Sequence, residues 1–180
     1  VETVIGGKTV RMGGIAKGSG MIHPNMGTML CFLTTDCAIS SEMIKSALLE
    51  TVQVSFNRIS VDGDTSTNDT LYGLANGASG VSASDEESLK ALSAALTSVL
   101  GDLAYMLVKD GEGASKVARI HVTGAASDAD AERVARTVGH SQLVKTALYG
   151  RDANWGRIVA AVGRSGADFN PDDVVVTLCG

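Results

Sequence analysis

Residues 28–57 read TMLCFLTTDCAISSEMIKSALLETVQVSFN, and the spacing of their apolar side chains changes halfway along. Over 28–36 the chain is apolar and β-branched, which predicts a buried strand. Over 40–57 the apolar residues fall on one helical stripe behind a serine that can cap a helix, which predicts an amphipathic helix. The strand is expected to bury Met29, Cys31 and Leu33, and the helix Ile44, Leu48, Val52 and Phe56.

The alternation of strand and helix continues on both sides of this stretch. Upstream, two β-prone runs joined by Gly6-Gly7 predict a hairpin, and the glycines over 13–20 predict a loop. Downstream, the capping box Ser84-Asp85-Glu86-Glu87 predicts a long helix over 84–109. Its stripe is expected to be Leu89, Leu92, Leu96, Val99, Leu103 and Met106. The other predicted elements are strands at 116–123, 143–149 and 174–179 and helices at 127–139 and 155–162. The pattern is typical of an α/β or α+β protein.

The composition argues against several classes of protein. The chain has 180 residues, 44% of them hydrophobic, which is enough for one good core or two small ones. Its 15 Lys and Arg against 20 Asp and Glu give a net charge of −5 without a basic cluster, so we expect no nucleic-acid partner. No apolar run predicts a membrane span, so we expect no membrane partner. Cys31, Cys37 and Cys179 form no C-x-x-C pair, which fits buried thiols in a reducing compartment.

Two segments look like ligand-binding loops and are interpreted otherwise. Lys17 precedes glycines and a strand, whereas the lysine of a phosphate-binding loop follows its glycines and precedes a helix. Residues 62–69, DGDTSTND, are similar to a calcium loop but lack its glycine at the sixth position and its glutamate at the twelfth, where Gly73 stands. A turn in which these polar side chains bond the neighbouring backbone is the favoured alternative. We therefore expect no metal site.

The junction of Gly27 and Thr28 has features that suit backbone self-cleavage. Gly27 has no side chain to shield its carbonyl, and the strand that follows would hold Thr28 in a fixed place. A threonine hydroxyl is a poor nucleophile, but an N-terminal threonine carries an α-amine, with a pKa of about 7.7–8.0, that can act as its base. Cleavage here would make Thr28 a catalytic nucleophile. Cys31 is a poor rival because strand alternation turns it to the opposite face.

Several longer motifs occur in order along the chain: GGIAKGSGMI, PNM-x-TML, VDGDTSTNDT, ANG, DGEGASK and LVKTALYGRDANWGRI. In this combination, which covers nearly the whole chain, the sequence closely resembles the ornithine acetyltransferase family (glutamate N-acetyltransferases of arginine biosynthesis). The resemblance implies an α/β layered sandwich with a mechanism like that of N-terminal-nucleophile enzymes. It also implies a precursor that cuts itself between Gly27 and Thr28.

By this resemblance the protein is a self-cleaving N-acetyltransferase. Thr28 would take the acetyl group from N-acetylornithine, release ornithine and pass the acetyl group to glutamate in a ping-pong reaction. Lys17 and Glu112 match substrate-binding residues of the family, and a cation together with a carboxylate suits substrates of both charges. No cofactor is implied, although some relatives use acetyl-CoA as the acetyl donor. Without the motifs, Lys17 reads as a surface lysine and Glu112 as a residue near a helix end.

The resemblance also sets expectations for the whole molecule. Residues 1–110 would belong to a main domain that contains the cleavage junction, and 111–180 to a second α/β segment. The family's N-terminal and C-terminal parts, with the oxyanion-hole Thr-Gly pair and further substrate-binding residues, are expected to lie outside the chain. We expect those segments as partners, an oligomer of two-chain protomers, and a location in the cytoplasm or, in a eukaryote, in an organelle matrix.

Two other functions fit the junction. A self-cleaving aminopeptidase or amidase would use water as the acceptor where the transferase uses glutamate. An uncut, non-catalytic relative that only binds a ligand would show neither scission nor acetyl transfer. The sequence alone leaves these alternatives open.

Overall fold

The chain folds into two compact units, Val1–Ala114 and Ser115–Gly180. The computed structural model describes residues 1–23 and 28–178. Each unit has its own cluster of buried hydrophobic side chains. The assignment of 1–110 to a main domain concerns the complete protein and stays a prediction.

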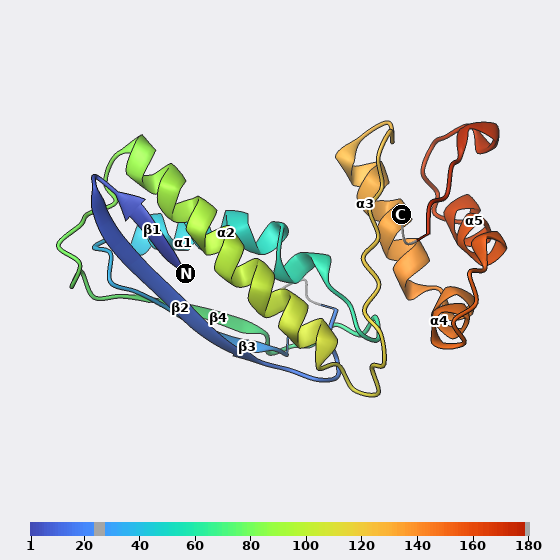
Figure 1. Cartoon of the computed structure of the whole chain (residues 1–180), viewed down its shortest axis with the longest axis horizontal. Helices are drawn as coiled ribbons and strands as arrows, with labels where there is room; N and C mark the ends of the chain where they lie inside the picture. The colour runs from blue at the N-terminus through green and yellow to red at the C-terminus, as the bar shows by residue number, and fades with distance from the viewer. Residues whose placement is uncertain (24–27, 179–180) are drawn as a thin grey trace. The chain divides into compact units, whose positions relative to one another are not determined.

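A four-stranded sheet forms the frame of the first unit (Figure 1). Its strands are β1 (Glu2–Ile5), β2 (Lys8–Lys17), β3 (Leu30–Thr35) and β4 (Thr70–Ala75). They lie in chain order, with β1–β2 and β2–β3 antiparallel and β3–β4 parallel. The predicted hairpin is confirmed: Gly6 and Gly7 join β1 to β2 with φ values of 57° and 75°, which glycine adopts without steric cost.

The second strand is longer than the sequence predicts. The expected loop over 13–20 is wrong for residues 13–17, which continue β2 and pair with β3, with Gly14 opposite Leu33. Backbone hydrogen bonds to a neighbouring strand outweigh the weak local preference of glycine. β4, a short strand with Gly73 in its interior that pairs with β3, is not predicted from the sequence. Strands of this kind are specified by their neighbours more than by their own residues.

Two long helices lie along one face of this sheet (Figure 1). The elements are α1 (Ser41–Gln53), the 3₁₀ turn η1 (Phe56–Arg58) and α2 (Glu86–Lys109). The Ser40 side chain caps α1 by accepting the N–H of Met43 at 3.3 Å, as predicted, but the helix ends earlier than residue 57. The cap of α2 is one residue later than predicted, because Asp85 accepts the N–H of Ser88 at 2.8 Å in a capping box of these two residues.

The core of the first unit lies between these helices and the covered face of the sheet. The strand residues predicted to be buried, Met29, Cys31 and Leu33, all have 0% exposure. The stripe predicted for α2 is confirmed at Leu92, Leu96, Val99 and Leu103. The prediction that Met106 is buried is wrong, since its side chain is 61% exposed, whereas Leu100 and Leu107 are buried. The reason is that α2 packs on both the sheet and α1 and therefore buries a wider stripe. By length and composition α2 would also suit a membrane span, but here it is the central helix of this core.

The second unit is helical. It contains α3 (Asp128–His140), α4 (Gln142–Tyr149), α5 (Trp155–Gly163) and the 3₁₀ turn η2 (Pro171–Asp173). The helices predicted over 127–139 and 155–162 are confirmed, and Ser127 caps the first of them. The strand predicted over 143–149 is wrong, because Ser141 caps a helix there that buries Val144 and Ala147 at helical spacing.

Two further predicted strands do not form in the described part of the chain. Residues 116–123 and 174–178 are neither helix nor strand, and position 179 lies outside the described residues. An isolated extended segment needs a neighbouring strand to satisfy its backbone hydrogen bonds. Alternating side chains alone therefore do not make a strand at these two places.

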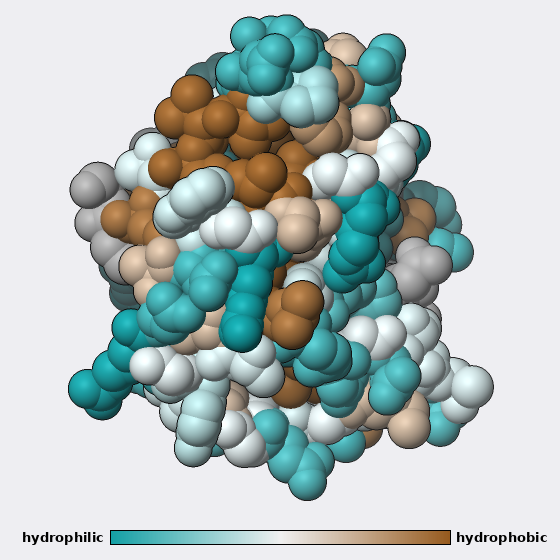
Figure 2. All heavy atoms as spheres, turned by 90° about the vertical axis from the view of Figure 1, so that its right-hand side faces the viewer, coloured by the Kyte–Doolittle hydropathy of each residue, from teal (hydrophilic) through white to brown (hydrophobic). Residues whose placement is uncertain are grey.

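Apolar side chains are exposed on the face of the sheet that α1 and α2 leave open. Ile15, Phe32 and Tyr72 occupy neighbouring register positions of β2, β3 and β4 and are 69%, 44% and 52% exposed. The rings of Phe32 and Tyr72 stack with their centroids 5.3 Å apart. Figure 2, which is viewed from the right-hand side of Figure 1, shows that hydrophobic side chains also gather on part of that surface.

Candidate functional site

Three strands bring the candidate site together at one end of the sheet. Lys17, the last residue of β2, is in register with Leu30, the first residue of β3, and Leu30 is in register with Thr70, the first residue of β4. The backbone N–H of Thr70 also donates to the carbonyl of Met29 at 3.0 Å. Thr28 precedes β3. It therefore lies at the same end of the sheet as Lys17 and as the residues that lead into β4.

Thr28 is half-buried and contacts both neighbouring segments. Its hydroxyl donates a hydrogen bond to the Ser66 Oγ and lies 3.8 Å from the sulfur of Met21. The ammonium nitrogen of Lys17 lies 3.5 Å from the Thr28 carbonyl oxygen. The structure thus brings two of the sequence-predicted site residues into contact. Gly27, the other side of the predicted cleavage bond, lies outside the described residues.

The polar segment 62–69 is a turn that holds the loop after β2. The Asp62 carboxylate accepts the backbone N–H groups of Met21 at 2.6 Å and Ile22 at 3.1 Å, and also that of Asp64 at 3.0 Å. Met21 has a φ of 54°, in the left-handed region that residues with a side chain rarely adopt. These contacts agree with the interpretation as a hydrogen-bonded turn. Among the described residues, no group of three or more His, Cys, Asp and Glu side chains is arranged to hold a metal ion.

Two residues of this turn, Ser66 and Asp69, are functional candidates. The sequence gives Asp69 a place in the turn or the pocket wall without a catalytic role, and it does not single out Ser66. Ser66 is 6% exposed, and its Oγ accepts the N–H of Asn68 at 3.1 Å as well as the hydroxyl of Thr28. Asp69 accepts the backbone N–H of Met29, the residue after Thr28. Burial raises the pKa of the Asp69 carboxyl, while the N–H of Met29 and the charge of Lys17 oppose that rise. A polar segment directly before a strand is a signal that could indicate these two residues. That signal is lost in the sequence-based prediction because the prediction does not include β4.

Glu112 lies against the loop that follows Lys17. Its backbone N–H donates to the Ser19 carbonyl at 2.8 Å. A Cβ added at Gly20 would lie 2.8 Å from the Glu112 carboxylate, so only glycine fits here without moving that side chain. The predicted carboxylate is therefore in the first unit, beside the segment that connects Lys17 to Met21.

Cys31 is buried on the helix-covered face of the sheet. Its exposure is 0%, and burial raises the pKa of its thiol to about 11. A thiol with such a pKa stays protonated at neutral pH and is a weak nucleophile. Cys31 is therefore a poor candidate for a nucleophile, as the strand alternation predicts.

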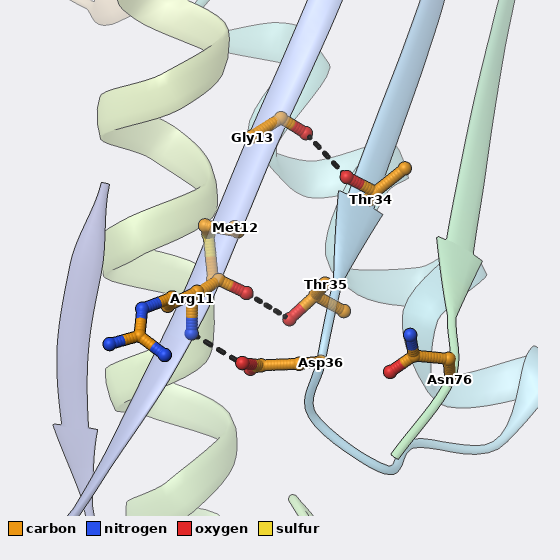
Figure 3. A pocket seen from close by; sticks show the side chains of 7 residues that line it. All are labelled: Arg11, Met12, Gly13, Thr34, Thr35, Asp36 and Asn76. Carbon is orange, nitrogen blue, oxygen red and sulfur yellow. Dashed lines mark hydrogen bonds between the residues drawn. The ribbon is translucent and has the colours of Figure 1, made fainter. Parts of the chain in front are cut away.

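A shallow cavity of about 210 Å³ lies at the other end of the sheet (Figure 3). It is lined by Arg11, Met12, Gly13, Thr34, Thr35, Asp36 and Asn76. Several of its polar groups already bond one another: Asp36 accepts the N–H of Arg11 at 2.8 Å, and the Thr35 hydroxyl donates to the Arg11 carbonyl at 3.0 Å. Since β3 separates this cavity from Thr28, it is not part of the candidate site.

Known proteins match the whole chain. A family model described as the ArgJ family matches residues 1–180. The arginine biosynthesis bifunctional protein ArgJ of Nitratidesulfovibrio vulgaris is 65% identical over 179 residues, which are 99% of this chain and 45% of that protein. The glutamate N-acetyltransferase of Methanocaldococcus jannaschii is 56% identical over 180 residues, 99% of this chain and 44% of that protein. The chain thus spans somewhat less than half the length of these relatives.

A solved structure also resembles the fold. It is the crystal structure of the arginine biosynthesis bifunctional protein argJ from Bacillus halodurans, with a TM-score of 0.73 and 45% sequence identity. The match covers 77% of this chain and 66% of that one. The likeness confirms the predicted α/β class.

Proposed function

Because the chain belongs to the ArgJ family, which bears out the family predicted from the motifs, we propose that the protein is a self-cleaving N-acetyltransferase of arginine biosynthesis. It transfers the acetyl group of N-acetylornithine to glutamate through an acetyl ester on Thr28. The names of the relatives support this activity, since one is a glutamate N-acetyltransferase and the other an arginine biosynthesis bifunctional protein.

The arrangement around Thr28 is the observation that carries the proposal. The hydroxyl of Thr28 is engaged by Ser66, its carbonyl lies near the Lys17 ammonium, and the next N–H is held by Asp69. A threonine held at its side chain and on its backbone is suited to attack a carbonyl in a fixed geometry. No comparable restraint is needed for a threonine that only leads into a strand.

The cleavage step makes the catalytic group. The Thr28 oxygen attacks the Gly27 carbonyl carbon, a C–O bond forms, the C–N bond between the two residues breaks, and the hydroxyl proton ends on the departing nitrogen. Water then hydrolyses the ester, which leaves a carboxylate on Gly27 and a free α-amine on Thr28. With a pKa of about 7.7–8.0, that amine is partly unprotonated near neutral pH and can accept the proton of its own hydroxyl.

The transfer proceeds in two half-reactions. The Thr28 oxygen attacks the acetyl carbon of N-acetylornithine, the proton passes through the α-amine to the departing nitrogen, and ornithine leaves. The amine of glutamate then attacks the acetyl ester, its C–O bond breaks, and Thr28 regains a proton. Lys17 and Glu112 supply a cation and a carboxylate to orient substrates that carry both charges.

The wider properties follow from the same proposal. The reaction uses only side chains, an amine and water, so no metal or resident cofactor takes part. The protein works in the cytoplasm or an organelle matrix, as an oligomer of two-chain protomers and with the further segments that the longer relatives contain. An assay with acetyl-CoA as the donor decides whether it also acetylates glutamate directly.

Substitution of Thr28 in the complete gene product tests the function. We expect Thr28→Ala to leave one uncut mass and to lower acetyl transfer by on the order of 10⁴-fold or more, whereas Thr28→Ser, which keeps the hydroxyl, still cuts and transfers. Intact-mass spectrometry measures the cut, and formation of N-acetylglutamate measures the transfer. Acetyl transfer that survives Thr28→Ala would show that Thr28 is not the nucleophile.

The acceptor separates the transferase from its rivals. Steady release of acetate without N-acetylglutamate would identify a hydrolase. A single uncut mass without an acetyl adduct, in the unmodified protein, would identify a non-catalytic relative.

A further inference from the structure

Ser66 combines three properties that a solvent-facing turn residue does not need. Its side chain is buried, its Oγ receives the Thr28 hydroxyl, and the same Oγ receives the N–H of Asn68 at 3.1 Å. The bond from Asn68 fixes the position of the Ser66 oxygen relative to its own backbone. The acceptor of the Thr28 hydroxyl is therefore anchored before any substrate arrives.

The residues after Ser66 hold the backbone next to Thr28. Asp69 accepts the N–H of Met29, and the N–H of Thr70 donates to the carbonyl of Met29 at 3.0 Å. Met29 itself is fully buried in the core. The segment 66–70 thus restrains the peptide that follows Thr28 and, through Ser66, the side chain of Thr28 itself.

Such a restraint matters for a threonine nucleophile. Threonine populates more than one χ1 rotamer, and its hydroxyl and methyl groups exchange places between them. A hydroxyl that points away from the carbonyl cannot attack it, and an error of about 1 Å in such a position can lower a rate by roughly 100-fold. A buried acceptor at a fixed place selects one rotamer of Thr28, the one whose oxygen reaches the Ser66 hydroxyl.

We propose that Ser66 is the positioning residue for the nucleophile, which holds the Thr28 oxygen in the attacking rotamer both in backbone scission and in acetyl transfer. This inference rests on the proposed function and names a residue for its central step. A serine hydroxyl can accept one bond and donate another. When the proton of Thr28 passes to the α-amine, the Ser66 hydroxyl can turn its own hydrogen toward the Thr28 oxygen and keep the contact.

Three variants of the complete gene product test the role. Ser66→Ala removes the acceptor, Ser66→Thr retains a hydroxyl at the same place, and Thr67→Ala removes a hydroxyl from the exposed neighbouring residue. We expect Ser66→Ala to lower two rates by about 10- to 100-fold: the rate at which the fragment that begins at Thr28 appears, and kcat for acetyl transfer. The KM for N-acetylornithine should stay unchanged within about twofold. Ser66→Thr is expected to recover most of the loss, and Thr67→Ala to match the unmodified protein.

The outcomes separate this inference from the proposed function. If the unmodified protein cuts and transfers while Ser66→Ala does both at the same rates, only the role of Ser66 is wrong. A loss confined to KM, or a loss that Ser66→Thr does not recover, would mean that Ser66 shapes the pocket or the fold and would also overturn the positioning role. If the unmodified protein cuts without transferring acetyl, the rate of cutting still tests Ser66 and the transferase proposal fails. If it does neither, both proposals fail.

Discussion

Gly14 lies in β2 where the strand passes under α2. A Cβ at this position would lie 2.9 Å from the Leu103 Cδ1 and 3.2 Å from the Phe32 carbonyl oxygen, and the second of these is backbone that cannot turn away. The adjacent Gly13 has nothing within 4 Å of the same point. Neither glycine has a left-handed φ, so a difference between their alanine variants reports packing alone.

We expect Gly14→Ala to lower the free energy of unfolding by about 1–3 kcal/mol through overpacking, and Gly13→Ala to change it by less than about 0.5 kcal/mol. Denaturant unfolding of the two variants measures both values. Equal effects in the two variants would contradict the close approach of α2 to Gly14.

The individual site residues divide by how the sequence reveals them. Thr28, Lys17 and Glu112 stand in motifs that resemble one family, so the sequence alone is sufficient to predict them as site residues. Ser66 stands in a polar string that local reasoning assigns to a turn, and that assignment is correct as far as it goes. Its contact with a residue 38 positions away is not encoded in local preference.

At the scale of elements, α2 begins with a cap whose strength depends on pH. Asp85 accepts the N–H of Ser88 at 2.8 Å, and the hydrogen bonds from Ser88 hold the pKa of the carboxyl below its ordinary value of 3.8. A carboxyl with a lowered pKa in the folded state stabilises the fold above the ordinary pKa, and this stabilisation is lost as the pH falls through the lowered value.

Asp85→Asn separates the charge from the cap. Asparagine caps helices about as well as aspartate, so we expect the melting temperature near neutral pH to change little. Between about pH 5 and pH 2 the variant should lose less stability than the unmodified protein, since it has no proton to bind at this cap. Melting temperatures measured across this range check the prediction, and parallel curves for the two proteins would contradict it.

The elements also differ in how far their own residues specify them. α1 and α2 have caps and apolar stripes that are sufficient for a prediction. α4 has the same features, but its apolar residues over 143–149 also fit a buried strand, and a helix of eight residues carries little periodicity to decide between the two. The tertiary packing of Val144 and Ala147 decides for the helix.

For the whole molecule, residues 115–123, which form neither helix nor strand, follow directly after the first unit. Arg119 is exposed there and lies outside any helix or strand, whereas the Lys116 ammonium donates to the Tyr149 carbonyl at 2.9 Å. Proteases cut first where the backbone opens at little cost.

In the 180-residue chain we expect brief trypsin treatment to cut first after Arg119 and to leave a resistant fragment that ends there. Mass spectrometry of the earliest fragments identifies the cut. Arg119→Gln serves as the control and should slow the first cleavage. First cuts within 2–17 or 86–109 would contradict the compactness of the first unit.

The amino-acid sequence by itself determined the hairpin at Gly6-Gly7, the buried strand after Thr28, the two capped helices of the first unit and the family, because turn chemistry, apolar period and motifs are local properties. Only the tertiary structure decided the length of β2, the existence of β4 and the failure of 116–123 to form a strand, because strand pairing depends on a neighbour distant in sequence. The same parallel pairing of β3 with β4 sets the polar turn beside Thr28, and so only the tertiary structure placed Ser66 against Thr28 and Asp69 against Met29.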